Sequence, residues 1–392
     1  MKQNTVDPVE LLGQLVSIPS YVAESANEVA LADFLTGFCE QYLPELTVEK
    51  QYIGDAGRYN VVIKGRRAPR LFVLGHIDTV RPKDSWQTDP FQPVIKNDRL
   101  YGLGAADMKG SIAAWLAALV SQKNEVRLDE LMMFFYVDEE YDFKGIRYFV
   151  ENMPADFAPQ LALSLDGDLE LTSGCRGLIE MNAVVRGKSG HASNPANGVN
   201  AITGTVAVFE ELKQQLFSYE DAYLGPSTCN LAYLRGGTVS VADGDLDWQR
   251  EGNVIPDFVD MTLEVRTAVR GLNARKVEAL LRKLAGRRDL AIDEVNIRHD
   301  IPPWPAAFGA EAMEAIKRAY RRADVTFKQG DLRLKGYIDA QMVAEKIAAP
   351  TFIIGAGGGN KHDADEYIPL DNLTKATRLY ESILQEFLGE TK

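Results

Sequence analysis

Apolar and polar positions follow two different periods along the chain, and their succession predicts an α/β architecture. Apolar residues spaced three and four apart predict amphipathic helices over 8–17 and 27–42. Short apolar runs suit buried strands, and they occupy residues 60–63, 70–74, 131–137 and 161–165. A helix rich in Ala and Leu is expected over 109–120. Strands that alternate with helices in this way predict a sheet with much parallel pairing.

The pattern changes after residue 177 and returns near residue 302. The expected elements between these points run β-α-β-β-α-β, at 178–187, 198–216, 230–234, 260–267, 273–285 and 290–298. A polar loop is expected over 236–252. This order fits a ferredoxin-like insert. Beyond it we expect further helices and one strand of the first domain, at 311–322, 340–346, 351–354 and 373–387.

Composition narrows the class of protein. A chain of 392 residues exceeds what one hydrophobic core usually supports, so two domains are expected. A net charge of -13 argues against a nucleic-acid surface. Residues 1–10 lack an apolar core behind basic residues, and no run of about 18 apolar residues occurs, so neither a secretory signal nor a spanning helix is expected. Three widely spaced cysteines, without a CxxC motif, predict reduced thiols and a cytoplasmic location.

His76, one of four histidines in the chain, lies near an acidic residue and directly after a predicted strand. His76 and Asp78 are two residues apart, so their side chains face the same way at the end of the 70–74 run. A carboxylate often orients an imidazole that binds a metal ion. The alternative is a surface His-x-Asp pair without a role.

Acidic residues stand at two further element ends. Asp107 precedes the 109–120 helix, and one carboxylate can bridge two cations that lie about 3.5–4 Å apart. A helix cap and a phosphate loop are alternatives, although the order Lys-Gly-Ser does not match a phosphate loop. Asp138, Glu139 and Glu140 end the 131–137 strand, where adjacent acids repel one another unless cations compensate them. A solvated turn is the alternative.

The last two elements complete a candidate metal site. Asp166 ends the 161–165 run, and Asp168 follows so closely that spacing leaves open which carboxylate points inward. His362 follows the glycine-rich segment 355–361, which lets a histidine approach an ion. The alternative for this segment is a nucleotide-binding loop, but the sequence around it does not match a nucleotide-binding motif. Imidazole and carboxylate together suit zinc and related divalent ions, and two such ions side by side hydrolyse amides.

In this order the motifs resemble a known family. They are His76-x-Asp78, Ala106-Asp107-Met108-Lys109-Gly110, Asp138-Glu139-Glu140, Asp166 and His362-x-x-x-Glu366-Tyr367. As a set they resemble the acetylornithine deacetylase / succinyl-diaminopimelate desuccinylase family of zinc peptidases, which includes glutamate carboxypeptidase, aminoacylase and peptidase T. The resemblance implies a zinc-peptidase catalytic domain with a mixed, mostly parallel sheet, formed by residues 1–177 and 299–392. A ferredoxin-like α+β dimerisation (lid) domain, residues 178–298, interrupts it.

The resemblance also implies a set of metal ligands. Asp107 bridges two metal ions; His76 and Asp166 complete the first site, and Glu140 and His362 complete the second. The cofactors implied are two divalent ions, zinc first, with cobalt or manganese as alternatives.

Catalytic roles follow from the same resemblance. Asp78 orients His76, and Glu139 is the general base that moves a proton from the metal-bridging water to the leaving nitrogen. His191 corresponds to a histidine that stabilises the oxyanion from a partner subunit, whereas the alternative is a strand-end histidine bonded to backbone.

Three substrate contacts are implied in addition. Asn253 matches a position that reaches the substrate, Arg266 one that grips a substrate carboxylate, and Gly336 begins a glycine-containing segment at the substrate wall. A structural salt bridge is the alternative for Arg266. His299 lies outside every motif and is expected to be structural.

Two departures from the family pattern shape the hypothesis. Asp166 stands where deacetylases, desuccinylases and carboxypeptidases usually carry Glu and di- and tripeptidases carry Asp, and residues 242–250 lengthen the loop before Asn253. We expect a two-metal amidohydrolase that cleaves an N-acyl amino acid or small peptide bearing a carboxylate, and a homodimer formed through residues 178–298. The alternatives are a peptidase T-like aminopeptidase and, in another class, a catalytically silent binding protein on this fold. Neither a nucleic-acid nor a membrane partner is expected.

Overall fold

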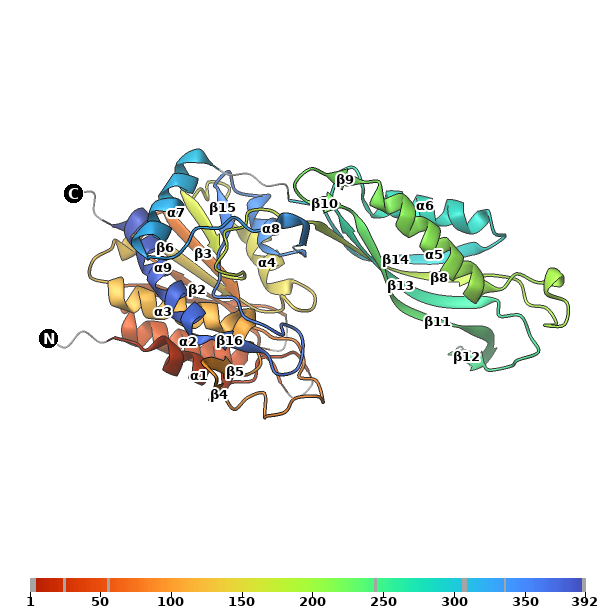
Figure 1. Ribbon diagram of the computed structural model, residues 1–392, viewed down its shortest axis with the longest axis horizontal. Coiled ribbons are helices and arrows are strands. Elements are labelled where there is room, and N and C mark those ends of the chain that lie inside the picture. The colour runs from red at the N-terminus through yellow and green to blue at the C-terminus, as the bar shows by residue number, and fades with distance from the viewer. Residues whose placement is uncertain are drawn as a thin grey trace. The chain divides into compact units, whose positions relative to one another are not determined.

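A computed structural model describes residues 5–389 apart from 24–25, 55–56, 243–244, 305–308 and 335. The chain divides into two compact units, both shown in Figure 1. Unit 1 comprises Met1–Ser173, Ala307–Gly330 and Ile338–Lys392, and unit 2 comprises Gly174–Ala306 and Asp331–Tyr337.

Unit 1 is built on a six-stranded sheet. Its order is β1 (Thr47–Tyr52), β2 (Tyr59–Lys64), β6 (Leu131–Tyr136), β3 (Leu71–His76), β7 (Leu161–Ser164) and β15 (Thr351–Ile353). The first three strands pair antiparallel, and the last four pair parallel. The predicted mixed, mostly parallel sheet is therefore confirmed. Because parallel strands end at the same edge, the segments that follow β3, β6 and β7 meet there.

Helices cover this sheet (Figure 1). They are α1 (Pro8–Val16), α2 (Val29–Tyr42), α3 (Gly110–Gln122), α4 (Lys144–Asn152), α7 (Ala310–Arg322), α8 (Ala340–Ala344) and α9 (Leu370–Leu388). A small sheet of β4 (Val94–Lys96), β5 (Arg99–Tyr101) and β16 (Tyr367–Pro369) lies beside them. Neither α4 nor β1 was expected from the apolar pattern, because most residues of β1 are exposed and α4 is short and polar.

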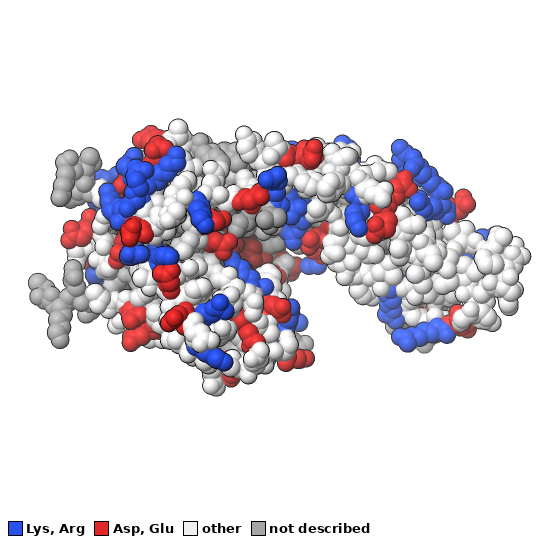
Figure 2. Space-filling model, viewed as in Figure 1, with Lys and Arg blue, Asp and Glu red and all other residues white. Residues whose placement is uncertain are grey.

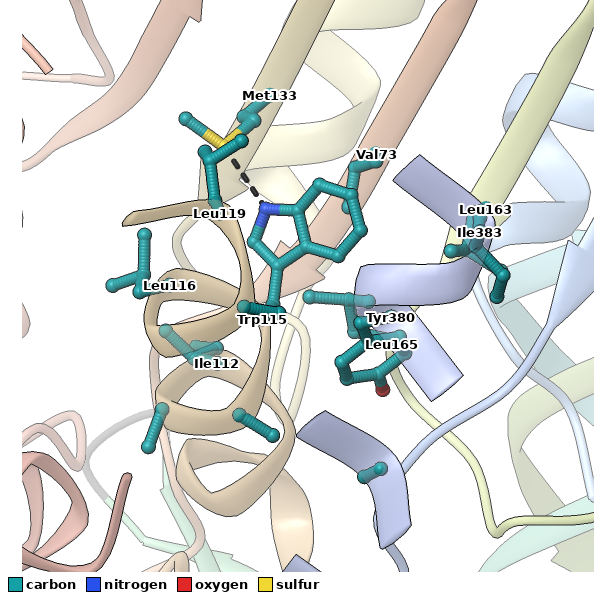
Figure 3. Packing of buried hydrophobic residues seen from close by; sticks show 14 of the residues in the cluster. Val73, Ile112, Trp115, Leu116, Leu119, Met133, Leu163, Leu165, Tyr380 and Ile383 are labelled. Atoms are coloured by element: carbon teal, nitrogen blue, oxygen red, sulfur yellow. Dashed lines mark hydrogen bonds between the residues drawn. The ribbon is translucent and has the colours of Figure 1, made fainter. Parts of the chain in front are cut away.

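The core of unit 1 is packed around Trp115 of α3 (Figure 3). The indole is fully buried, and its Nε1 donates to the sulfur of Met133 on β6 at 3.0 Å. The Tyr380 ring on α9 meets it edge to face, with centroids 5.5 Å apart. These contacts fix α3, and hence the segment just before it, against the sheet.

Unit 2 is an α+β layer of five antiparallel strands. The sheet order is β12 (Asp245–Gln249), β11 (Thr228–Ala242), β13 (Phe258–Thr267), β8 (Gly177–Arg186) and β14 (Ala291–Ile301). Its helices are α5 (Ala201–Phe217) and α6 (Ala274–Gly286), and short strands β9 (Glu220–Asp221) and β10 (Gly225–Pro226) follow α5. The ferredoxin-like β-α-β-β-α-β succession is confirmed, with β12 added to it.

The prediction of a polar loop over residues 236–252 is wrong. Strand β11 continues to Ala242 and pairs with β12, in a register that runs from Thr238 opposite Gln249 to Ala242 opposite Asp245. Trp248 packs edge to face on Phe258, and the Arg235 guanidinium lies 4.2 Å from its ring centroid. Packing of Trp248 against side chains of β11 and β13 therefore stabilises a segment whose polar residues indicate a loop.

None of the helices in the described part of the chain is long and apolar enough to cross a membrane. Cys39, Cys175 and Cys229 all lie in the described part of the chain, and none of them forms a disulfide.

Candidate metal centre

His76 is the last residue of β3 and is almost completely buried. Its Nδ1 lies 3.2 Å from the backbone oxygen and 3.5 Å from the carboxylate of Asp78. These contacts direct the other nitrogen, Nε2, toward Asp107 Oδ1 at 3.3 Å. The strand thus presents one imidazole nitrogen to the end of the sheet, while the other is held from behind.

Asp107 lies in the turn Ala105–Lys109, which leads directly into α3. The Glu366 carboxylate holds this turn by accepting the backbone N–H groups of Gly104, Ala106 and Asp107 at 2.8 to 2.9 Å. Asp107 Oδ1 faces His76, and Oδ2 lies 3.4 Å from His362 Nε2. The Asp107 carboxylate therefore contacts two histidines, each through a different oxygen.

The loop after β6 brings Glu139 and Glu140 to the same place. The Asp78 carboxylate accepts the backbone N–H of Glu139 at 3.0 Å and that of Glu140 at 2.9 Å. Glu140 Oε1 lies 3.1 Å from His362 Nε2. Asp138 departs from this arrangement, because its carboxylate pairs with Arg58 at 2.6 Å. The interpretation that cations in a metal site compensate all three acids is thus corrected: a guanidinium compensates Asp138.

Three groups of side chains can place their ligand atoms within 4.8 Å of one another. The groups are His76, Asp107, Asp166; His76, Glu139, Glu140; and Asp107, Glu140, His362. Asp166, and not Asp168, joins the cluster. Imidazole nitrogens and carboxylate oxygens are the donors that zinc accepts, so these residues fit a pair of divalent ions.

Electrostatics in the cluster agree with this fit. Burial, with repulsion from Asp339, raises the pKa of Glu139 well above its usual range, and burial also raises the pKa of Glu140 and Asp166. The hydrogen bonds that His362 donates to the carboxylates of Asp107 and Glu140 raise its pKa to about 10. Buried carboxylates that repel one another require positive charge, which either protons or metal cations can supply.

Two residues behind the cluster were not assigned from the sequence. Asp339, at the start of α8, is fully buried, accepts the Tyr136 hydroxyl at 2.7 Å, and has a pKa that burial raises to about 7. Glu366 lies four residues after His362 in the motif His362-x-x-x-Glu366-Tyr367, and this spacing is the sequence signal that could have identified it. Nothing in the local pattern around Asp339 marked it as a buried acid.

The remaining predicted residues belong to unit 2, where the structure brings two of them together. His191 is exposed and pairs with Val254, the neighbour of Asn253, in an antiparallel bridge. Its Nδ1 accepts the backbone N–H of Ser193 at 3.2 Å. Arg266 donates through Nε to Glu264 at 2.9 Å, and Gly336 is exposed.

The chain is similar to known proteins along nearly its whole length. Residues 72–386 match the model of peptidase family M20/M25/M40. The chain is similar to the acetylornithine deacetylase of Buchnera aphidicola subsp. Schizaphis graminum, with 24% identity over 97% of each chain. It is 26% identical to the succinyl-diaminopimelate desuccinylase of Halorhodospira halophila, over 97% of this chain and 98% of that one. Its fold resembles the crystal structure of aminopeptidase PepT from Bacillus cereus, with a TM-score of 0.72, 21% identity, and coverage of 97% and 98%.

Proposed function

The chain belongs to peptidase family M20/M25/M40 and is a hydrolase of amide bonds, and from this premise we propose that it deacylates an N-acyl amino acid. The similarity to a deacetylase and a desuccinylase supports deacylation. The observation that carries the metal-dependent hydrolysis is the position of Asp107, whose two carboxylate oxygens lie 3.3 and 3.4 Å from His76 and His362. A carboxylate that bridges two cations has to offer its oxygens in this way.

In the proposed site, Asp107 is shared between two metal ions. His76 and Asp166 would complete one set of ligands, and Glu140 and His362 the other. The donor set of nitrogen and oxygen favours zinc, and cobalt or manganese would fit the same ligands. When bound, the two ions acidify a shared water and polarise the amide carbonyl.

Glu139 is the proposed general base. Asp78 fixes the backbone of Glu139, and the Glu139 side chain shares a ligand cluster with His76 and Glu140. From that position its carboxylate takes a proton from the attacking water and gives it to the leaving nitrogen. Burial and repulsion from Asp339 raise the pKa of the Glu139 carboxyl group, which favours its accepting a proton.

His191 is the proposed oxyanion donor. A backbone N–H can only donate, so the hydrogen bond from Ser193 to Nδ1 places the proton of the neutral ring on Nε2. An N–H at Nε2 can donate to a developing oxyanion. We propose that Asn253 assists at the same position and that Arg266 holds the substrate carboxylate, with Gly336 at the substrate wall.

We further propose a homodimer formed through residues 178–298, in which His191 serves the site of the other subunit. Unit 2 exposes large apolar side chains at Val206, Phe217, Tyr223, Tyr233 and Ile297. In Figure 2 the surface over the amino-terminal half of α5 carries few charged side chains. Such a surface suits contact with a second copy of the chain. A cytoplasmic location remains our prediction.

A second candidate function is a di- or tripeptide aminopeptidase. Asp166 favours this function, because the di- and tripeptidase branches of the family usually carry Asp at this position. The fold similarity to aminopeptidase PepT also favours it. An aminopeptidase requires a free amine on its substrate. Rates on N-acetyl amino acids and on unblocked dipeptides therefore separate the two functions.

The test is a hydrolysis screen of both substrate classes with zinc, cobalt and manganese, on wild type and on Glu139→Ala. We expect hydrolysis that a chelator abolishes and that the substitution lowers about 10²–10⁴-fold. Wild-type protein that binds fewer than one ion and hydrolyses neither class contradicts the proposed function. A Glu139→Ala protein at full rate contradicts the role of Glu139 alone.

A further inference from the structure

The segment 137–145, called the loop below, joins β6 to α4 and includes the first two residues of α4. It carries the proposed base and one proposed metal ligand. We infer that Arg58 and Asn60, at the start of β2, are positioning residues that hold this loop in its working conformation. The inference rests on the proposed function, because the importance of the loop comes from Glu139 and Glu140. The contacts that carry it lie within unit 1.

Asn60 joins the two ends of the loop through one side chain. Its Oδ1 accepts the backbone N–H of Val137 at 3.2 Å, and its Nδ2 donates to the backbone oxygen of Gly145 at 2.9 Å. The Asn60 side chain is fully buried, so water cannot replace either bond. The backbone at Gly145 packs directly against this side chain, since a Cβ atom added to Gly145 would lie 2.6 Å from Asn60 Oδ1.

Arg58 holds the loop through the carboxylate of Asp138. Its Nη2 lies 2.6 Å from Asp138 Oδ1, and its Nε and Nη2 form a fork on Glu28 from the segment before α2. The exposed fractions of Arg58, Glu28 and Asp138 are 8%, 0% and 1%. A charged group buried this completely is stable only when it is paired with an opposite charge. The Arg58 guanidinium therefore fixes the position of the Asp138 carboxylate.

This anchor determines where the next two acids point. Asp138 has a φ of 72°, a left-handed conformation that residues other than Gly rarely adopt. Its Oδ2 also accepts the backbone N–H of Lys144 at 3.3 Å. With Asp138 turned toward Arg58, Glu139 and Glu140 follow at the end of β6 with their backbone N–H groups on Asp78. The loop is thus held by β2 on one side and by Asp78 on the other.

The first test is hydrogen exchange on the metal-free protein, which reports the loop without any catalysis. We expect Asn60→Asp to reduce the protection of amides in 137–145, because a carboxylate cannot donate to the Gly145 carbonyl. Gln51→Ala is the matched control, since Gln51 accepts a hydrogen bond from the Asn60 amide at 3.4 Å and lies on β1, outside the loop. Its exchange in 137–145 should equal that of wild type.

The second test measures metal binding and steady-state kinetics. For Asn60→Asp we expect metal affinity or kcat to fall about 10–100-fold, the usual effect of losing a partner behind a metal ligand, with KM nearly unchanged. Arg58→Lys keeps the buried positive charge but loses the paired hydrogen bonds to Glu28. If Asn60→Asp does not fold, the same measurements on Arg58→Lys test the positioning role.

Two outcomes separate the inference from the proposed function. If wild type hydrolyses its substrate and both variants keep wild-type exchange, metal affinity and kcat, the positioning role is overturned. If wild type neither binds metal ions nor hydrolyses, the proposed function fails first, whereas the exchange measurement still tests whether Arg58 and Asn60 order the loop.

Discussion

Asp78 connects the two halves of the candidate metal centre. Its carboxylate lies 3.5 Å from His76 Nδ1 and accepts the backbone N–H groups of Glu139 and Glu140. We expect Asp78→Asn to lower metal affinity or kcat about 10–100-fold, because an amide holds the imidazole less firmly and loses one of its acceptors. Metal titration followed by kinetics at saturating metal would measure both effects.

The matched control is Asp84→Asn, which makes the same exchange at an exposed position. It should leave metal affinity and kcat unchanged. Wild-type metal affinity and kcat in Asp78→Asn would show that the backbone oxygen of Asp78 alone orients His76.

At the level of residues, the sequence was informative where the chemistry is local. His76 and Asp78 could be paired because residues two apart on a strand share a face. Arg58 could not be connected with Asp138, nor Tyr136 with Asp339, because 80 and 203 positions separate the partners. A single sequence carries no periodic signal for such contacts, so buried partners behind a site emerge only from the fold.

At the level of elements, buried strands and long amphipathic helices were predictable, whereas segments with polar exteriors were not. The hairpin of β11 and β12 was expected to be a loop, because its sequence is rich in polar residues. Strand β1 was missed because it lies at a sheet edge and is mostly exposed. In both cases tertiary pairing outweighed the local pattern.

The packing of α3 against α9 and the sheet leads to a stability prediction. Trp115→Ala removes a fully buried indole that contacts Met133 and Tyr380, so it leaves a cavity between α3, β6 and α9 (Figure 3). We expect the free energy of unfolding to fall by about 3–5 kcal/mol, measured by chemical denaturation. Tyr148→Ala, whose side chain is 41% exposed, is the control and should change it by less than about 0.5 kcal/mol. An equal effect of both substitutions would mean that this core does not limit stability.

At the level of the whole molecule, the proposed dimer divides one catalytic set between two chains. Glu139 belongs to unit 1 and His191 to unit 2, and we propose that a working site takes these residues from different subunits. Glu139→Gln and His191→Ala should each be nearly inactive alone. A mixed dimer of the two variants would contain one site with both residues intact, because the two sites of a symmetric dimer exchange the same residues.

Mixing equal amounts of the two variants, after dissociation and reassembly, should therefore restore about a quarter of wild-type activity, since half the dimers are mixed and each has one intact site. The activity should depend on exchange of subunits, so mixing without dissociation is the control. Tagged subunits would establish that mixed dimers form. If mixed dimers are present and remain inactive, His191 acts within its own chain or not at all. Recovery of activity would instead tie the catalytic histidine to the neighbouring subunit and make the dimer a condition for hydrolysis.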